Sequence, residues 1–169
     1  KPDWTELLDN FIIAFRKAIE LGLDLRFSGL HYMGYPKSRF CGACGTNLAV
    51  TPEGYLTTCY EVVHVDDPAS KYFMIGHIGS NDVVIDWDKY KYLRNRITNT
   101  MSDCNDCYLK LMCAGDCPVK SYRETGSIFG VDIERCDFKR ILNRRIIEMI
   151  IDNQYIPKNY ISILDYKGV

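Results

Sequence analysis

Eight cysteines are the residues of this chain most able to carry chemistry. Four of them form two Cys-x2-Cys pairs, a spacing at which the backbone curls around a metal centre so that both thiolates reach it. The pairs are Cys41 with Cys44 and Cys104 with Cys107, and the remaining cysteines are Cys59, Cys113, Cys117 and Cys136. Eight thiolates make two sets of four, the number that a structural zinc ion or an iron–sulfur cubane requires.

Residue types alone leave zinc and iron–sulfur clusters equally open. Disulfides are less favoured, because disulfide-rich secreted domains are usually smaller and poorer in core residues than this chain, which also contains amphipathic helical patterns. No secretion signal is visible, so we expect a reducing, cytoplasmic setting in which thiolates act as metal ligands. The chain begins at Lys1 without a methionine, and we interpret it as a section of a longer protein.

The composition is that of a globular domain with a core of its own. Hydrophobic residues make up 47% of the 169 residues and charged residues 25%. The net charge of −1 gives no electrostatic footprint for nucleic acid or an anionic membrane. No apolar run approaches the roughly 20 residues needed to cross a bilayer. We therefore expect neither nucleic acid nor a membrane as a partner.

The N-terminal residues predict a helix followed by a strand. Asp3 with Glu6 three residues later is typical of a helix start, and apolar residues recur at helical spacing from Trp4 until Gly22. Apolar and charged residues then alternate over 23–27, which predicts a short strand. Together these elements would form one helix–strand step of an α/β unit.

A β-hairpin is predicted over residues 47–60, around a Thr-Pro-Glu-Gly turn. Proline suits the second position of such a turn, and glycine supplies a positive φ at its end. Pairing Val50 with Tyr55 would place Cys59 about two residues from Cys44, on strands roughly 4.8 Å apart. The hairpin therefore predicts that Cys59 converges with the first Cys-x2-Cys pair.

The remaining elements surround the second cysteine region. A loop rich in aspartate and glycine is expected after the hairpin, up to Asp86, which opens a predicted helix to about Ile97. Cys136 begins a long predicted helix with an apolar face that includes Phe138 and Ile146.

The complete cysteine spacing resembles a known family. Nine residues separate Cys44 from Gly54-x4-Cys59, and Cys104-x2-Cys107-x5-Cys113-x3-Cys117 is followed by the isolated Cys136. This pattern resembles the SPASM domain, the C-terminal extension of many radical-SAM enzymes that modify peptides and proteins, such as anaerobic sulfatase maturases and ribosomal-peptide maturases. The resemblance covers about residues 41–136, over half of the chain.

This resemblance implies two auxiliary 4Fe–4S clusters whose ligands are interleaved in the sequence. The first cluster would be held by Cys41, Cys44, Cys59 and Cys117. The second would be held by Cys104, Cys107, Cys113 and Cys136. Spacing alone would instead favour one self-contained site from Cys104 to Cys117, with its last two cysteines one helical turn apart. In the family, such clusters transfer electrons or position the substrate peptide during post-translational modification.

Two positions depart from the family pattern. Sulfatase-maturing members carry an aspartate directly after the cysteine that matches Cys59, where it accepts a proton, whereas this chain has Tyr60 followed by Glu61. The departure favours a peptide-modifying relative with a different target. The family often shows two glycines before the fourth ligand of the first cluster, but here Gly115 is followed by Asp116, whose side chain we expect to face solvent.

We predict a small α+β fold with a β-hairpin, cysteine-rich loops and flanking helices, organised by the clusters. Residues 1–27 resemble the last helix and strand of a partial radical-SAM barrel, 28–152 the SPASM domain, and 153–169 a C-terminal tail. The chain has no Cys-x3-Cys-x2-Cys motif, so the cluster that cleaves S-adenosylmethionine cannot be built here and we expect no catalysis by this chain alone. The implied partners are the radical-SAM catalytic domain of the parent protein, which would bind S-adenosylmethionine, and a peptide or protein substrate.

The alternative hypothesis is a structural or protein-docking module without a redox role. The same cysteines would then hold zinc, or the clusters would serve only to organise the fold. Zinc is also an expected occupant after aerobic preparation, because exposed clusters are lost in air and the vacated thiolates bind other metals or become oxidised.

Overall fold

The computed structural model describes residues 1–23, 25, 27–28 and 36–152. Helices and a four-stranded antiparallel sheet make up this part of the chain, which confirms the predicted α+β class. The chain divides into two compact units, one joining residues 1–36 to 133–169 and the other spanning 37–132. This division differs from the predicted boundaries, because it groups the last helix with the N-terminal helix. The predicted tail lies outside the described residues.

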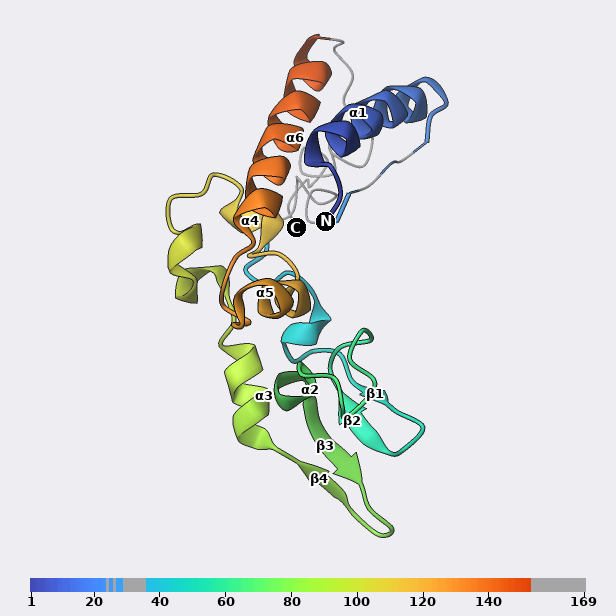
Figure 1. Cartoon of the computed structure of the whole chain (residues 1–169), viewed down its shortest axis with the longest axis vertical. Helices are drawn as coiled ribbons and strands as arrows, with labels where there is room; N and C mark the ends of the chain where they lie inside the picture. Colours follow the sequence, from blue (N-terminus) through green and yellow to red (C-terminus); the bar gives the residue numbers. More distant parts are fainter. Residues whose placement is uncertain (24, 26, 29–35, 153–169) are drawn as a thin grey trace, which may run out of the picture. The chain divides into compact units, whose positions relative to one another are not determined.

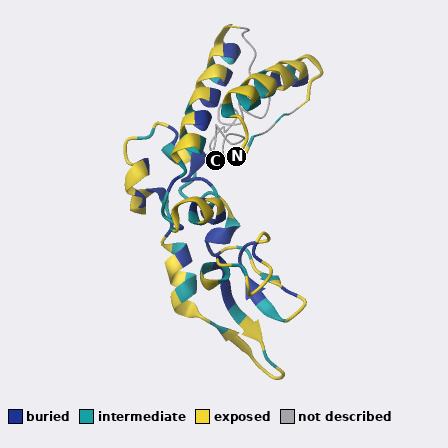
Figure 2. Cartoon of the chain, in the orientation of Figure 1, coloured by how far each residue is buried: buried dark blue, intermediate teal, exposed yellow. Residues whose placement is uncertain are grey.

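The first unit contains two helices, α1 (Trp4–Glu20) and α6 (Ile133–Asp152). Helix α1 begins as predicted, because the Asp3 carboxylate accepts the N–H groups of Thr5 and Glu6 at 2.9 and 3.0 Å. Helix α6 begins three residues before Cys136, so the predicted start at that cysteine was too late. Buried residues of α6 recur at helical spacing, seen as repeated dark blue segments along its ribbon (Figure 2); the apolar ones include Phe138, Leu142, Ile146 and Met149.

The strand predicted over 23–27 is wrong at the positions that the structure describes. Leu23, Leu25 and Phe27 have no strand conformation. The Phe27 ring instead packs edge-on against Phe11 of α1, with ring centroids 5.5 Å apart, and lies 5.2 Å from the ring of Phe138. Aromatic packing onto two helices takes the place of the hydrogen-bonded neighbour that a strand requires.

The second unit contains the sheet, whose strands lie side by side in chain order (Figure 1). They are β1 (Ala49–Val50), β2 (Tyr55–Thr57), β3 (Met74–Ile78) and β4 (Val83–Ile85), and all neighbours are antiparallel. The short helix α2 (Ser70–Phe73) precedes β3. The sequence predicts a loop between the first hairpin and Asp86. In the structure, β3 and β4 instead form a second hairpin within this stretch, around Gly-Ser-Asn-Asp.

The register of the first hairpin differs by one residue from the prediction. Val50 pairs with Leu56, whereas we had expected it opposite Tyr55. The reason lies in the turn, where the Thr51 N–H donates to the Tyr55 carbonyl at 2.9 Å and Gly54 takes a φ of +86°. Three residues therefore close the loop in place of four, and the one-residue shift exchanges the two faces of the strand.

The remaining helices of the second unit flank the cysteine loops. Helix α3 (Trp87–Arg94) begins as predicted, because the Asp86 carboxylate accepts the Lys89 N–H at 2.9 Å, but it ends three residues before Ile97. Short 3-10 turns and helices lie on both sides of α3 in the chain: η1 (Gly42–Cys44) precedes the sheet, and η2 (Thr98–Thr100), η3 (Ser102–Cys104), α4 (Lys110–Cys113) and α5 (Pro118–Thr125) come after α3.

We expect Gly54→Ala to destabilise the second unit by about 1–2 kcal/mol, because an alanine would have to adopt the left-handed conformation. A Cβ at this position would lie 3.5 Å from the Ile78 carbonyl oxygen, an ordinary contact, so the cost is conformational and not steric. Urea denaturation measures the change. Gly54→Asn is the matched variant and should lose less stability, since asparagine tolerates this conformation. An asparagine variant no more stable than the alanine variant would contradict this explanation of the turn.

Candidate metal centres

The first Cys-x2-Cys pair lies at the two ends of the turn η1. Cys41 is its N-cap residue, and the Cys44 N–H donates to the Cys41 carbonyl at 3.3 Å. Gly45 ends the turn with a φ of +88°, and a Cβ there would lie only 2.7 Å from Cδ of Arg94 on α3. Glycine is therefore required both by the backbone conformation and by the close approach of α3.

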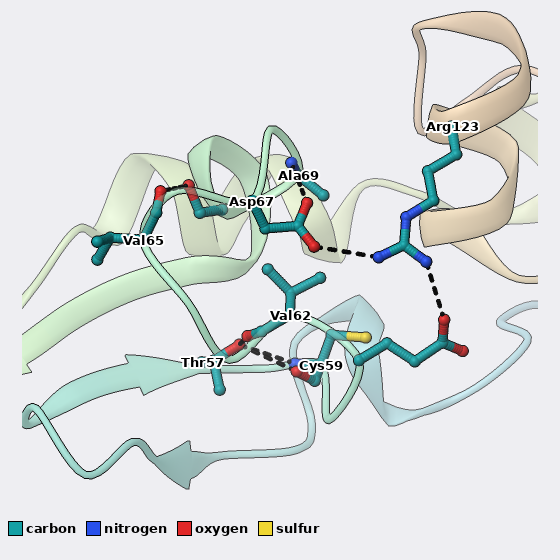
Figure 3. Close-up of polar contacts among 9 residues, drawn as sticks. Thr57, Cys59, Val62, Val65, Asp67, Ala69 and Arg123 are labelled. Carbon is teal, nitrogen blue, oxygen red and sulfur yellow. Dashed lines mark hydrogen bonds and ion pairs between the residues drawn. The ribbon is translucent and has the colours of Figure 1, made fainter.

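Cys59 follows β2 in a tight turn that Thr57 organises. The Thr57 hydroxyl accepts the Cys59 N–H at 3.2 Å and donates to the Val62 carbonyl at 2.8 Å (Figure 3). The Val62 N–H donates back to the Cys59 carbonyl at 3.0 Å. Thr57 and Val62 are both fully buried, so this turn is fixed from inside the protein.

The hydrophobic core joins the segments that carry the first cysteines to a segment far along the chain. Ala43, Cys59 and Val119 belong to one buried cluster, and the partly buried Cys117 packs against it. Ala43 lies within the first Cys-x2-Cys pair, and Val119 follows Cys117 in helix α5. The core thus brings three separate cysteine-bearing segments to one place.

The electrostatics of four thiols agree with this arrangement. Burial is the main reason that the pKa of the Cys41 thiol rises to about 11, although the residue as a whole is exposed, and repulsion from the other three thiolates adds to the rise. Burial also raises the pKa of Cys44 and of Cys59, and Cys117 adds to the rise at Cys59. We call Cys41, Cys44, Cys59 and Cys117 the first thiol group.

A second thiol group is formed by Cys104, Cys107 and Cys113. The Cys107 N–H donates to the Cys104 carbonyl at 3.2 Å, and the Cys113 N–H donates to the Leu109 carbonyl at 2.8 Å, so consecutive turns place the three thiols together. Burial is the largest cause of the raised pKa of Cys104, and repulsion from Cys113 and Cys107 contributes. Leu109, only 1% exposed, anchors these turns in the interior.

The backbone between Cys113 and Cys117 reverses direction. Helix α4 ends at Cys113, and the next three residues, Ala114, Gly115 and Asp116, all have positive φ, at 55°, 77° and 60°. The helical spacing of the last two cysteines therefore does not occur. Cys113 lies with the second thiol group, whereas Cys117 lies with the first.

Cys136 is partly buried on helix α6 and belongs to the first unit, whereas the second thiol group belongs to the second unit. Its assignment to the second cluster stays a prediction. Within the described ranges, no three or more His, Cys, Asp or Glu side chains form a group that could hold a single metal ion.

The two departures from the family pattern have different environments. Asp116 is buried, at 6% exposed, and its carboxylate accepts the Cys117 N–H at 2.7 Å, so the expected solvent-facing orientation is wrong. Aspartate tolerates the left-handed conformation, which is also the conformation that favours a glycine at this position.

Tyr60 is 69% exposed, and Glu61 forms an ion pair with Arg123 at 3.3 Å. The same arginine binds the Asp67 carboxylate at 3.1 Å (Figure 3).

Two arginines beside the thiols were missed by the sequence analysis. The positive charges of Arg96 and Arg39 oppose the burial that raises the pKa of Cys44. Arg39 donates to the Arg94 carbonyl at 2.8 Å, and Arg96 is fully buried. Neither arginine lies in a motif, so only the fold reveals their position.

Comparison with known proteins gives no assignment: no protein family matches this sequence, and no curated protein matches it. In the part of the chain that the structure describes, none of the helices has the length and apolar character required to span a membrane.

We expect Cys41 in the metal-free folded protein to react slowly with iodoacetamide at pH 8.5. With its pKa near 11, few molecules carry the reactive thiolate at that pH, and the rate should keep increasing as the pH is raised toward 11. Mass spectrometry of differentially labelled peptides measures the rate. The same protein in urea is the control, and its Cys41 should titrate near the ordinary value of about 8.5. Equal pH profiles in the two states would contradict the burial of this sulfur.

Proposed function

We propose that this chain is the auxiliary-cluster domain of a radical-SAM enzyme that modifies a peptide or protein. Its eight cysteines would bind two 4Fe–4S clusters, which exchange electrons with the reaction or help to position the substrate. The observation that carries the proposal is the packing of Cys117, at the start of helix α5, against the core cluster that contains Cys59 and Ala43 of the first Cys-x2-Cys pair. The family resemblance implies this interleaved grouping, and spacing alone does not.

The donor set fits such clusters. Cysteine thiolates are the standard ligands of a 4Fe–4S cluster, four for each. A zinc ion needs all four sulfurs at about 2.3 Å from one point, whereas a cubane takes each thiolate on a different iron atom and so accepts ligands that lie farther apart. The four cysteines of the first thiol group match the number of thiolates that one cubane takes.

The raised pKa values describe the thiols in the metal-free protein. Thiolates that are buried together are unstable without positive charge, so the thiols of the metal-free protein hold their protons. A cluster releases those protons and supplies the charge that makes four neighbouring thiolates stable. When bound, the clusters would supply one-electron redox chemistry, and the protein residues would fix their position and solvent access.

The missing motif assigns a supporting role to this chain. Without the Cys-x3-Cys-x2-Cys sequence there is no set of ligands for the cluster that cleaves S-adenosylmethionine. We therefore infer that the radical forms in another domain of the parent protein. The cluster-binding unit would accept or relay an electron, with a peptide or protein as substrate. The replacement of aspartate by Tyr60 favours a target other than a sulfatase.

Anaerobic reconstitution with iron and sulfide should give a brown protein with about eight irons per chain, two cubanes' worth. Iron and acid-labile sulfide assays measure the content, and electron paramagnetic resonance of the dithionite-reduced protein should show cluster signals. A colourless protein that keeps stoichiometric zinc through the same treatment would contradict the proposal and favour the structural zinc module.

A pair of matched variants tests the interleaved grouping. Replacing Cys41, Cys44, Cys59 and Cys117 by alanine should leave about four irons, because the second cluster keeps all its ligands. The matched variant replaces Cys136 in place of Cys117 and should keep fewer than four irons, since it removes three ligands of the first cluster and leaves the second with only three cysteines. If Cys104 to Cys117 formed one self-contained site, the two variants would show the opposite iron contents.

A further inference from the structure

Arg96 is a fully buried arginine with an unusual set of partners. It follows helix α3, and its guanidinium donates to two backbone carbonyls, through Nε to Ile128 and through Nη2 to Gly115 at 2.7 Å. A further Nη2 contact reaches the Ser121 hydroxyl at 3.4 Å. Its Nη1 is buried and has no hydrogen-bond partner among the protein atoms of the described structure.

The two backbone carbonyls and the hydroxyl that Arg96 contacts are neutral groups. No carboxylate forms an ion pair with it within the described ranges. A guanidinium is always charged in proteins, and a buried charge without an opposite charge is costly. Within the described ranges, the fold therefore holds this positive charge in the interior without an ion pair to a carboxylate.

Arg96 contacts the backbone segment that lies between the two thiol groups in the chain. Gly115, which accepts the bond from Nη2, lies in the left-handed segment between Cys113 and Cys117, where the two thiol groups separate. A Cβ on Gly115 would lie 3.6 Å from the unpartnered Nη1. The positive charge of Arg96 opposes the rise in pKa that burial causes at two thiols, Cys44 of the first thiol group and Cys104 of the second.

We propose that Arg96 is the shared counter-cation of the two cysteine-ligated clusters and that it raises the reduction potential of both. This inference rests on the proposed function. Adding one electron to a cluster adds one negative charge without any change in bonding or protonation, and a buried cation nearby stabilises the reduced form more than the oxidised form. The free Nη1 donors would also bind a cluster or thiolate sulfur, a bond that further favours the reduced state.

The effect of Arg96 should exceed that of a surface charge. Water screens exposed charges, whereas a fully buried guanidinium acts through a medium of low dielectric constant. Arg39 offers an internal comparison, because its charge acts on Cys44 and its Nη2 is held by the Arg94 carbonyl. It should therefore influence the first cluster, while Arg96 influences both.

The test is a redox titration of the reconstituted protein, followed by electron paramagnetic resonance of each cluster. In Arg96→Met, both clusters should become harder to reduce, with the ratio of reduced to oxidised cluster at a fixed potential falling at least tenfold, about 59 mV for one electron. Arg96→Lys keeps the charge and should retain both potentials within about half of that shift. Arg39→Met, the matched control, should shift the first cluster only.

A purely structural role for Arg96 predicts other results. Arg96→Met would then lower stability or cluster content while the clusters that remain keep the potentials of the unaltered protein, and that result would overturn the proposal. The unaltered protein gives a second measurement that does not depend on folding of a variant. Labelled with ¹⁵N-arginine, its reduced clusters should show electron–nuclear coupling to guanidinium nitrogen, and the absence of coupling in a fully loaded sample would also overturn it. Failure of the unaltered protein to bind iron at all would instead refute the proposed function.

Discussion

Burial of neighbouring thiols is the constraint on which the rest of this structure depends. The first thiol group gathers four sulfurs from three separate segments at one side of a hydrophobic core. Such a group is stable only if its members stay protonated or if positive charge is supplied to them. The raised pKa of Cys41 describes the first state, and a bound metal cofactor would create the second. Binding of the proposed cofactor would therefore be coupled to folding.

The core and the turns decide which sulfurs share a site. Ala43 and Val119 are buried in one cluster, which brings the N-terminal cysteine pair to the start of helix α5. The left-handed residues 114–116 then turn the chain away from the second thiol group. Two cysteines only four residues apart can therefore serve different sites, because backbone direction and not sequence distance determines where each thiol lies.

Positive charge is supplied from inside the fold, in addition to the charge that the proposed clusters would bring. Arg96 is held by backbone carbonyls on both sides, so its position is fixed before any cofactor binds. A cation fixed in this way needs no reorganisation when an electron arrives, and this is the property that distinguishes an electron-transfer site from a simple structural metal site. The proposed supporting role in radical chemistry and the proposed role of Arg96 thus share one physical basis.

The sequence by itself determined the α+β class, the first helix with its Asp3 cap and the start of helix α3. These features depend on local periodicity, capping and turn residues. It did not determine the hairpin register, the second hairpin, the buried orientation of Asp116 or the position of Arg96. Register depends on how many residues close the turn, and the environment of a charged side chain depends on segments distant in sequence, so only the tertiary structure decided them.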